Sequence, residues 1–525
     1  MVLTRWNPPP DRFRIPVARR QWQTSVPARA HRIVAALLLG MVLFPLASLA
    51  QEGKVQVESN EQLFNVLAAL NDAGYDAGLG VDTGTKAREA VRADLARKQI
   101  PVIADIRKFY DAHKVVGNPG RNLGQYISLA LLLGPPPDFK FTVAQADLPP
   151  DAKNVAGLVP LLKLFYKQAD MVDLWARASV DFHTAIEQYS SPVRRSIQLT
   201  DAYLRFPAGS YLGRTYTIYL DLLGSPNQVQ ARIYGANYYM VITPSKNLRI
   251  RDIRHQYLHF LLDPLAVKYS DEIHQAAALE ALARKAPALR SDFKADFSLL
   301  VTECLIRAVE LRMDKVPAPE VTKQIGQMTS AGFILVPYFY NALQQFEKQE
   351  TAMGGYYEQM IKAINPGEEA LRLGKVKFTE PPKPAATAAA SGLTAEEQLL
   401  DKGDNGIYSG DYAGAKEVFA QVLSNDPKNE RALFGMAVVA SSTGKPDLAR
   451  KYFKETLNSA SDLRIVTWCH IYLGRLDDIN GSRTSALAQY RAASLTAGRY
   501  PEAMRAVEKG LKIPFGLEFQ PPAGH

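Results

Sequence analysis

The apolar residues of positions 51–205 recur every three or four residues, which is the spacing of one buried helix face. The clearest example places apolar side chains at Leu63, Phe64, Val66, Leu67 and Leu70. Similar patterns predict helices over 87–113 and 170–188, with Pro101 breaking or kinking the first of them. We therefore expect residues 51–205 to form a helical N-terminal region.

The period changes to two residues beyond position 210. Strand patterns rich in Thr, Tyr, Ile and Val cover residues 215–221, 229–234 and 238–243. We predict that they form a small antiparallel sheet, whose edge strand can hold an extended peptide by strand addition. The next helix carries His255 and His259, and we expect Pro264 to end it. Further helical patterns follow up to residue 348.

A linker is predicted over 376–393, because its proline- and alanine-rich centre, residues 378–391, has no large apolar residue after Phe378. Beyond it, four anchors recur 34 residues on: Gly410, Ala415, Phe419 and Leu423 return as Gly444, Ala449, Phe453 and Leu457. A third copy has Gly481, Ala486 and Tyr490. This pattern resembles the tetratricopeptide repeat, a pair of helices that pack closely over a small Ala. The resemblance implies an all-α solenoid with a capping helix over 501–511, and a protein or peptide partner.

The apolar run 33–50 follows seven arginines and one acid, and it ends in the small residues Ala47-Ser48-Leu49-Ala50. This pattern predicts a signal peptide over residues 1–50 with cleavage near Ala50, and hence a secreted or periplasmic protein. An uncleaved anchor is the alternative, because 18 residues are close to the minimum for spanning a bilayer. After cleavage we expect no membrane span.

The charge of the chain is nearly balanced outside this leader. The leader holds seven of the 62 Lys and Arg residues and one of the 53 Asp and Glu residues, so the rest has a net charge of +3. This balance gives no support for a nucleic-acid or anionic membrane partner. The two cysteines, Cys304 and Cys469, fall in different predicted domains, and we expect buried free thiols rather than a disulfide.

The strongest chemical signal is the pair His255 and His259. Side chains four residues apart share one helix face, so both histidines can bind one metal ion. Catalytic zinc takes three protein ligands and keeps one open position. The best third ligand is Glu303, an acid among the apolar residues of 300–309, and Glu280 is the weaker candidate.

Two further acids lie near these ligands in the sequence. Asp263 follows His259 by four residues, where it either orients that histidine or is simply a residue at the end of the helix. Glu310 is flanked by Arg307 and Arg312, so we expect it to be solvated or salt-bridged.

Residues 210–350 resemble the gluzincin branch of zinc metallopeptidases in the last predicted strand, the two-histidine helix and the later helix with Glu303. The resemblance implies a zincin-like domain in which the two histidines and Glu303 bind zinc. It also implies a downstream residue that stabilises the oxyanion. Tyr338 is the candidate for this role by position alone, and a core aromatic is the alternative.

Two residues depart from the pattern of that family. Gln256 stands where the family has the catalytic glutamate, and an amide cannot accept a proton from a metal-bound water. Loss of a general base lowers a rate by about 10²–10⁴-fold. Arg307 stands where many gluzincins place an acid. The sequence thus keeps a metal site and loses its base.

The sequence predicts an α+β protein with a helical region over 51–205, a zincin-like domain over 206–375 and a repeat solenoid over 394–515. The favoured function is an exported protein whose degenerate metallopeptidase-like domain binds polypeptide while the repeats scaffold a partner protein. One alternative is an active zinc peptidase whose base is Glu303 or Asp263. The other is a purely structural repeat scaffold.

Overall fold

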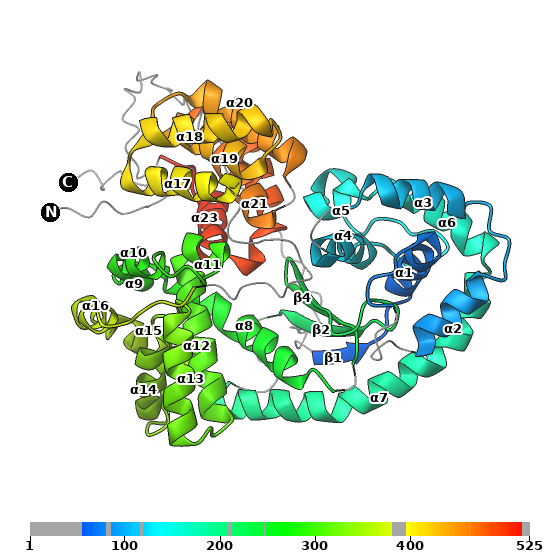
Figure 1. The fold of residues 1–525 in the computed structure, drawn as a ribbon, viewed down its shortest axis with the longest axis horizontal. Coiled ribbons are helices and arrows are strands. Elements are labelled where there is room, and N and C mark those ends of the chain that lie inside the picture. The colour runs from blue at the N-terminus through cyan, green and yellow to red at the C-terminus, as the bar shows by residue number, and fades with distance from the viewer. Residues whose placement is uncertain are drawn as a thin grey trace, which may run out of the picture.

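The computed structural model describes residues 55–79, 86–115, 119–206, 213–245, 247–380, 395–460 and 462–516. These residues form a mostly helical structure around one four-stranded sheet (Figure 1). The predicted signal peptide and most of the predicted linker lie outside them. Within the described ranges, the helices are all too short or too polar to cross a membrane.

The sheet is mixed, so the prediction of an antiparallel sheet is wrong. Its order is β1-β2-β4-β3, and its strands are β1 (Val55–Glu58), β2 (Thr215–Leu220), β3 (Val229–Tyr234) and β4 (Asn237–Ile242). Only β3 and β4 pair antiparallel, as a hairpin, whereas β2 is parallel to both β4 and β1. Alternating residues predict a strand but not its direction, and β1 comes from the region that we expected to be helical.

The N-terminal helices form their own core. They are α1 (Glu61–Ala73), α2 (Lys86–Leu95), α3 (Ile103–Ala112), α4 (Pro119–Leu131), α5 (Pro150–Asn154), α6 (Leu158–Gln168) and α7 (Met171–Leu204). The 34-residue α7 continues past the predicted end at residue 188 and through Pro192. Its Phe182 packs into the N-terminal core and its Val193 into the core of the middle domain. This single helix therefore joins the two domains (Figure 1).

The middle domain packs α8 (Ile250–Lys268) between β4 and α12 (Phe297–Met313). The shorter helices α9 (Ser270–His274), α10 (Glu280–Ala283) and α11 (Ser291–Ala295) connect them, and α13 (Ala318–Ser330), α14 (Val336–Phe346), α15 (Met353–Lys362) and α16 (Pro366–Leu373) follow. Helix α8 does not end at Pro264, as we expected, but continues to Lys268. Proline lacks the N–H that the Phe260 carbonyl would accept, and Arg214 donates to that carbonyl instead, at 2.7 Å.

The C-terminal module consists of three helix pairs and a last helix. The pairs are α17 (Ala395–Ser409) with α18 (Tyr412–Asn425), α19 (Glu430–Ser442) with α20 (Pro446–Ser459), and α21 (Leu463–Ile479) with α22 (Arg483–Ser494). A Cβ on Gly435 would lie 2.4 Å from the Phe419 ring, so only glycine permits this close packing. Gly410, Gly444 and Gly481 all have positive φ between paired helices, which explains why the 34-residue period includes a glycine.

The module docks on the middle domain through its last helix, α23 (Pro501–Lys512). This helix packs against α8 and α12, the two helices that carry the predicted metal ligands. Helix α19 contacts both α17 and α21, and these three helices line one face of the module, which we call the inner face. Cys304 and Cys469 are buried and free, as predicted.

Candidate metal centre

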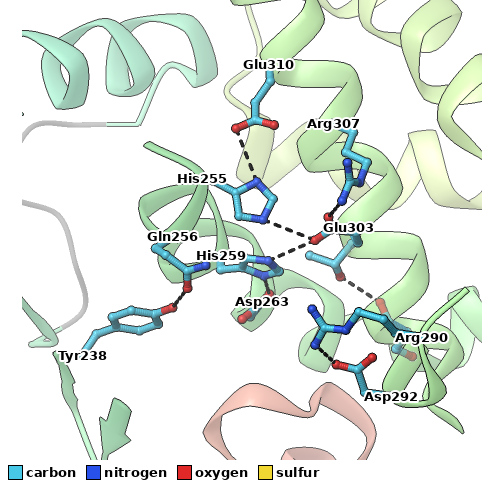
Figure 2. A network of polar contacts seen from close by, with 12 residues as sticks. Tyr238, His255, Gln256, His259, Asp263, Arg290, Asp292, Glu303, Arg307 and Glu310 are labelled. Carbon is cyan, nitrogen blue, oxygen red and sulfur yellow. Dashed lines mark hydrogen bonds and ion pairs between the residues drawn. The ribbon is translucent and has the colours of Figure 1, made fainter. Parts of the chain in front are cut away.

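The structure brings His255, His259 and Glu303 together (Figure 2). Helix α8 presents the histidines one turn apart, and α12 carries the glutamate across the interface of the two helices. The Nε2 atoms of His255 and His259 lie 3.5 and 3.2 Å from the same oxygen, Glu303 Oε2. The three candidate ligand atoms all lie within 4.8 Å of one another.

A separate carboxylate orients each histidine. The Nδ1 atom of His259 lies 3.0 Å from Asp263 Oδ1, and the Nδ1 atom of His255 lies 3.3 Å from Glu310 Oε1. A partner on Nδ1 fixes the ring and leaves Nε2 available to a metal, as in many zinc sites. Asp263 therefore orients His259 rather than ending the helix.

The contact of Glu310 with His255 was not predicted from the sequence, from which we expected this acid to be solvated or paired with its flanking arginines. Glu310 follows Glu303 by seven residues, two helical turns, and so lies on the same face of α12. That spacing is the signal that would have identified it.

The donor set fits zinc. Ligand atoms 2.0–2.1 Å from an ion at tetrahedral angles are about 3.3–3.4 Å apart, close to the 3.5 and 3.2 Å that separate the two Nε2 atoms from Glu303 Oε2. Two imidazoles and one carboxylate are common zinc ligands. The Glu303 side chain is only 3% exposed, and a buried carboxylate requires compensating positive charge.

The electrostatics of the cluster favour positive charge. Burial alone would lower the pKa of His255, but its contacts with Glu303 and Glu310 outweigh burial and raise the pKa to about 10. Burial likewise opposes the charged form of His259, yet Asp263 and Glu303 raise its pKa. Burial would raise the pKa of Glu303, but the two histidines hold it well below its usual range. The site thus attracts cations, which are either protons or a metal ion.

Gln256 points away from the two histidines, toward β4 (Figure 2). The hydroxyl of Tyr238 donates to Gln256 Oε1 at 2.8 Å. Arg307 lies 2.6 Å from Glu303 Oε1, the oxygen that does not face the histidines. This ion pair leaves Glu303 one oxygen for a metal and places a positive charge beside the site.

Two residues considered from the sequence lie elsewhere. The hydroxyl of Tyr338 donates to the Met360 carbonyl at 2.6 Å, and so packs α14 against α15 rather than entering the cluster. This geometry fits the alternative of a core aromatic better than the candidate oxyanion role. Glu280, the weaker ligand candidate, forms an ion pair with Arg284.

The edge strand nearest to this site is packed on both faces. Arg232 of β3 donates to the Gly124 carbonyl of α4 at 2.9 Å. A Cβ on Gly498, just before α23, would lie 2.6 Å from the Ile233 side chain. The Arg232 and Ile233 side chains point to opposite faces of the sheet, so both faces of β3 are packed, and strand addition at its backbone edge stays a prediction. A cavity of about 340 Å³ remains between α8 and α23, lined by His259, Tyr238, Phe260 and Met504 among others.

Comparison with known families gives one result. Residues 407–465 match the tetratricopeptide repeat family. The match spans α18, α19 and α20 and confirms the repeat prediction for this part of the module. Repeats of this family generally mediate contacts between proteins. No curated protein and no solved structure matches the chain.

Proposed function

We propose that this protein is an exported zinc-binding protein whose metallopeptidase-like domain binds polypeptide without cleaving it efficiently, while its repeats contact a partner protein. The observation that carries the proposal is the convergence of His255, His259 and Glu303, with a separate carboxylate behind each histidine. A bare pair of surface histidines would not need a separate carboxylate to orient each ring. Bound zinc would supply Lewis acidity and a coordination position for a carbonyl or carboxylate of the polypeptide.

The contacts of the acids argue against the alternative of an active peptidase. Gln256 has no carboxylate and is bonded to Tyr238. Glu303, Asp263 and Glu310 each contact a histidine ring nitrogen, so each already serves as a ligand or an orienting group. A general base must instead reach the proton of the attacking water.

The test is the zinc content of the mature chain, residues 51–525, measured by mass spectrometry of the metal after reconstitution and dialysis. We expect about one zinc per chain and a loss of at least about tenfold in affinity for His259→Ala. His183→Ala is the matched control, because His183 is exposed on α7 and contacts only Glu187 among the described residues. A wild-type chain that binds no zinc would support the purely structural alternative.

Cleavage of casein then separates binding from catalysis. We expect no zinc-dependent cleavage by the wild type. Gln256→Glu restores a carboxylate at the position of the missing base, so a gain of activity in this variant would show that the base is what the site lacks. Zinc-dependent cleavage by the wild type, abolished by His259→Ala, would refute the proposal in favour of an active peptidase.

Export is tested independently. The leader predicts that secreted protein begins at Gln51, which N-terminal sequencing of the exported chain would show. Retention of residues 1–50 would favour the uncleaved anchor instead.

A further inference from the structure

The inner face of the first repeat holds side chains from the middle domain. Asp401, Asp404 and Tyr408 lie on α17, and Arg431 lies at the start of α19. Opposite them is the segment 284–294, which connects α10 to α12. Figure 1 shows the module lying directly over α11, which is part of this segment. The first repeat thus already has an occupant from its own chain.

Arg284 is the central contact. Its guanidinium carbon lies 3.2 Å from the centre of the Tyr408 ring, so the planar cation stacks on the aromatic face. Tyr408 also accepts a hydrogen bond from Arg284, and Asp404 lies one helical turn before it on the same face. An aromatic ring beside a carboxylate is a suitable receptor for a guanidinium, which uses both its charge and its flat surface.

A second cation joins it. Lys294 interacts electrostatically with Asp401 and is half-buried. Asp401 and Asp404 both bond Arg431, at 2.5 and 2.7 Å, and Arg464 of α21 also interacts with Asp404 and Tyr408, so the face contributes two carboxylates and two guanidiniums. The Tyr408 ring and the Asp401 carboxylate, rather than a net negative charge, therefore receive Arg284 and Lys294.

The first repeat contacts the middle domain through two long side chains, whereas α23 docks on it by helix packing. Helix α23 packs along α8 and α12, whereas the first repeat is reached by the long side chains of Arg284 and Lys294. Long cationic side chains exchange partners more readily than interlocked helices do. The first repeat can therefore release its occupant while the last helix stays docked.

We propose that the inner face of the first repeat recognises an arginine-bearing basic segment, which Arg284 and Lys294 imitate within the chain, and that a partner protein binds by displacing them. The inference rests on the proposed role of the module in protein contacts. It is independent of the zinc site, so either proposal can fail without the other.

The test uses a fluorescent peptide of residues 282–295 and the mature chain, with binding followed by fluorescence anisotropy at low salt. The double variant Arg284→Ala/Lys294→Ala empties the face. We expect it to bind the peptide at least about tenfold more tightly than the wild type, in which the internal segment competes. Lys285→Ala is the matched control, since this exposed neighbour has no place on the face, and it should bind as the wild type does.

Two further changes locate the site. A peptide with alanine at position 284 should bind the emptied variant at least about tenfold more weakly. Tyr408→Ala in that variant should abolish binding, and Asp401→Asn, which leaves the buried ring in place, should weaken binding and reduce its salt dependence. Circular dichroism checks that both variants stay folded.

Equal binding by the wild type and the emptied variant would overturn the proposal. So would undiminished binding after both Tyr408→Ala and Asp401→Asn, or equal affinity for a peptide whose Lys and Arg are replaced by Glu. Absence of binding to the emptied variant would also refute it.

Discussion

The contact between α12 and α23 contains two buried acids, and it predicts that docking of the module depends on pH. Asp296 is the N-cap of α12, and its Oδ1 accepts from the Leu299 N–H at 2.8 Å. Glu502, at the start of α23, accepts from the backbone N–H groups of Phe297 and Ser298. Each acid thus sits at the junction of two helix N-termini. Asp296 Oδ2 is buried and has no hydrogen-bond donor among the residues that the structure describes.

The pKa of Glu502 is raised to about 7, mainly by burial and next by the negative charge of nearby Glu280. The opposing effect of Arg284, which lowers this pKa, is smaller than that of Glu280. Burial and Glu502 also raise the pKa of Asp296. His274 Nε2 lies 3.7 Å from Glu502 Oε1 and completes the charged surroundings. The folded protein therefore keeps a proton on Glu502 up to about pH 7, whereas the unfolded chain loses it near the usual value of 4.5.

The direction in which pH changes the free energy of unfolding follows from this difference in pKa. Between pH 4.5 and 7 the folded state binds more protons, so the free energy of unfolding falls as the pH rises, and above pH 7 this group adds no further change. A shift of this size corresponds to at most about 3 kcal/mol. The Glu502 side chain is 11% exposed, so solvent screens the effect little. We expect α23 to dock more weakly at pH 8 than at pH 5.5.

Glu502→Gln should remove this dependence. The amide oxygen still accepts from α12, and the amide NH₂ can donate to the unpaired Asp296 Oδ2. Hydrogen exchange of the α23 amides, corrected for the intrinsic effect of pH, measures the local opening. We expect wild-type protection to fall by up to about 30-fold between pH 5.5 and 8, and protection in the variant to change by less than about threefold.

Glu508→Gln, on an exposed acid of the same helix, is the control and should behave as the wild type. Equal wild-type protection at both pH values would refute the reasoning. An unchanged pH dependence in Glu502→Gln would show that another group is responsible. Loss of protection in the variant at both pH values would show that the contact needs the carboxylate itself.

Three further predictions follow from the packing. Arg307→Gln should tighten zinc binding by about tenfold, because it removes a positive charge from beside Glu303. The control Arg251→Gln, at an exposed arginine, should leave the affinity unchanged, and zinc titration against a competing chelator measures both. Gly435→Ala should destabilise the module by about 1–3 kcal/mol and lower the thermal midpoint of unfolding, because the new Cβ meets the Phe419 ring. The control Gly326→Ala has open space around its Cβ and should not lower the midpoint. Cys304 and Cys469 should resist a thiol reagent in the folded chain and react after denaturation, because burial raises the pKa of both thiols, to about 12 for Cys304.

The sequence predicted those parts of the fold that local periodicity controls. The repeat pairs follow from glycine, alanine and aromatic residues 34 positions apart, because the same close packing recurs in each pair. Three of the four strands were located correctly, but periodicity could not show that β2 pairs parallel with β4 or that β1, about 160 positions from β2 in the sequence, joins the sheet. The course of α8 past Pro264 depends on Arg214, which no pattern within the helix could indicate.

The candidate site was predictable where chemistry restricts the choice. Two histidines on one helix face and one acid in an apolar helix are unusual enough to be noticed, and the structure brings them together. The sequence could not settle the contacts of Glu310 and Tyr338, because these depend on which neighbouring element each residue faces. The sequence placed Glu310 with adjacent arginines, whereas the packing of α8 on α12 pairs it with His255.

The two departures from the peptidase pattern make sense together when the charges of the buried site are considered. Arg307 adds a positive charge through its ion pair with Glu303, and Arg214 adds another beside Asp263. Gln256 is uncharged, and its Oε1 accepts a hydrogen bond from Tyr238. Neither Gln256 nor Arg307 can accept a proton from water, so both departures lead away from general-base chemistry. They leave Glu303 Oε2 facing the two histidines, which is the arrangement that the proposed zinc site requires.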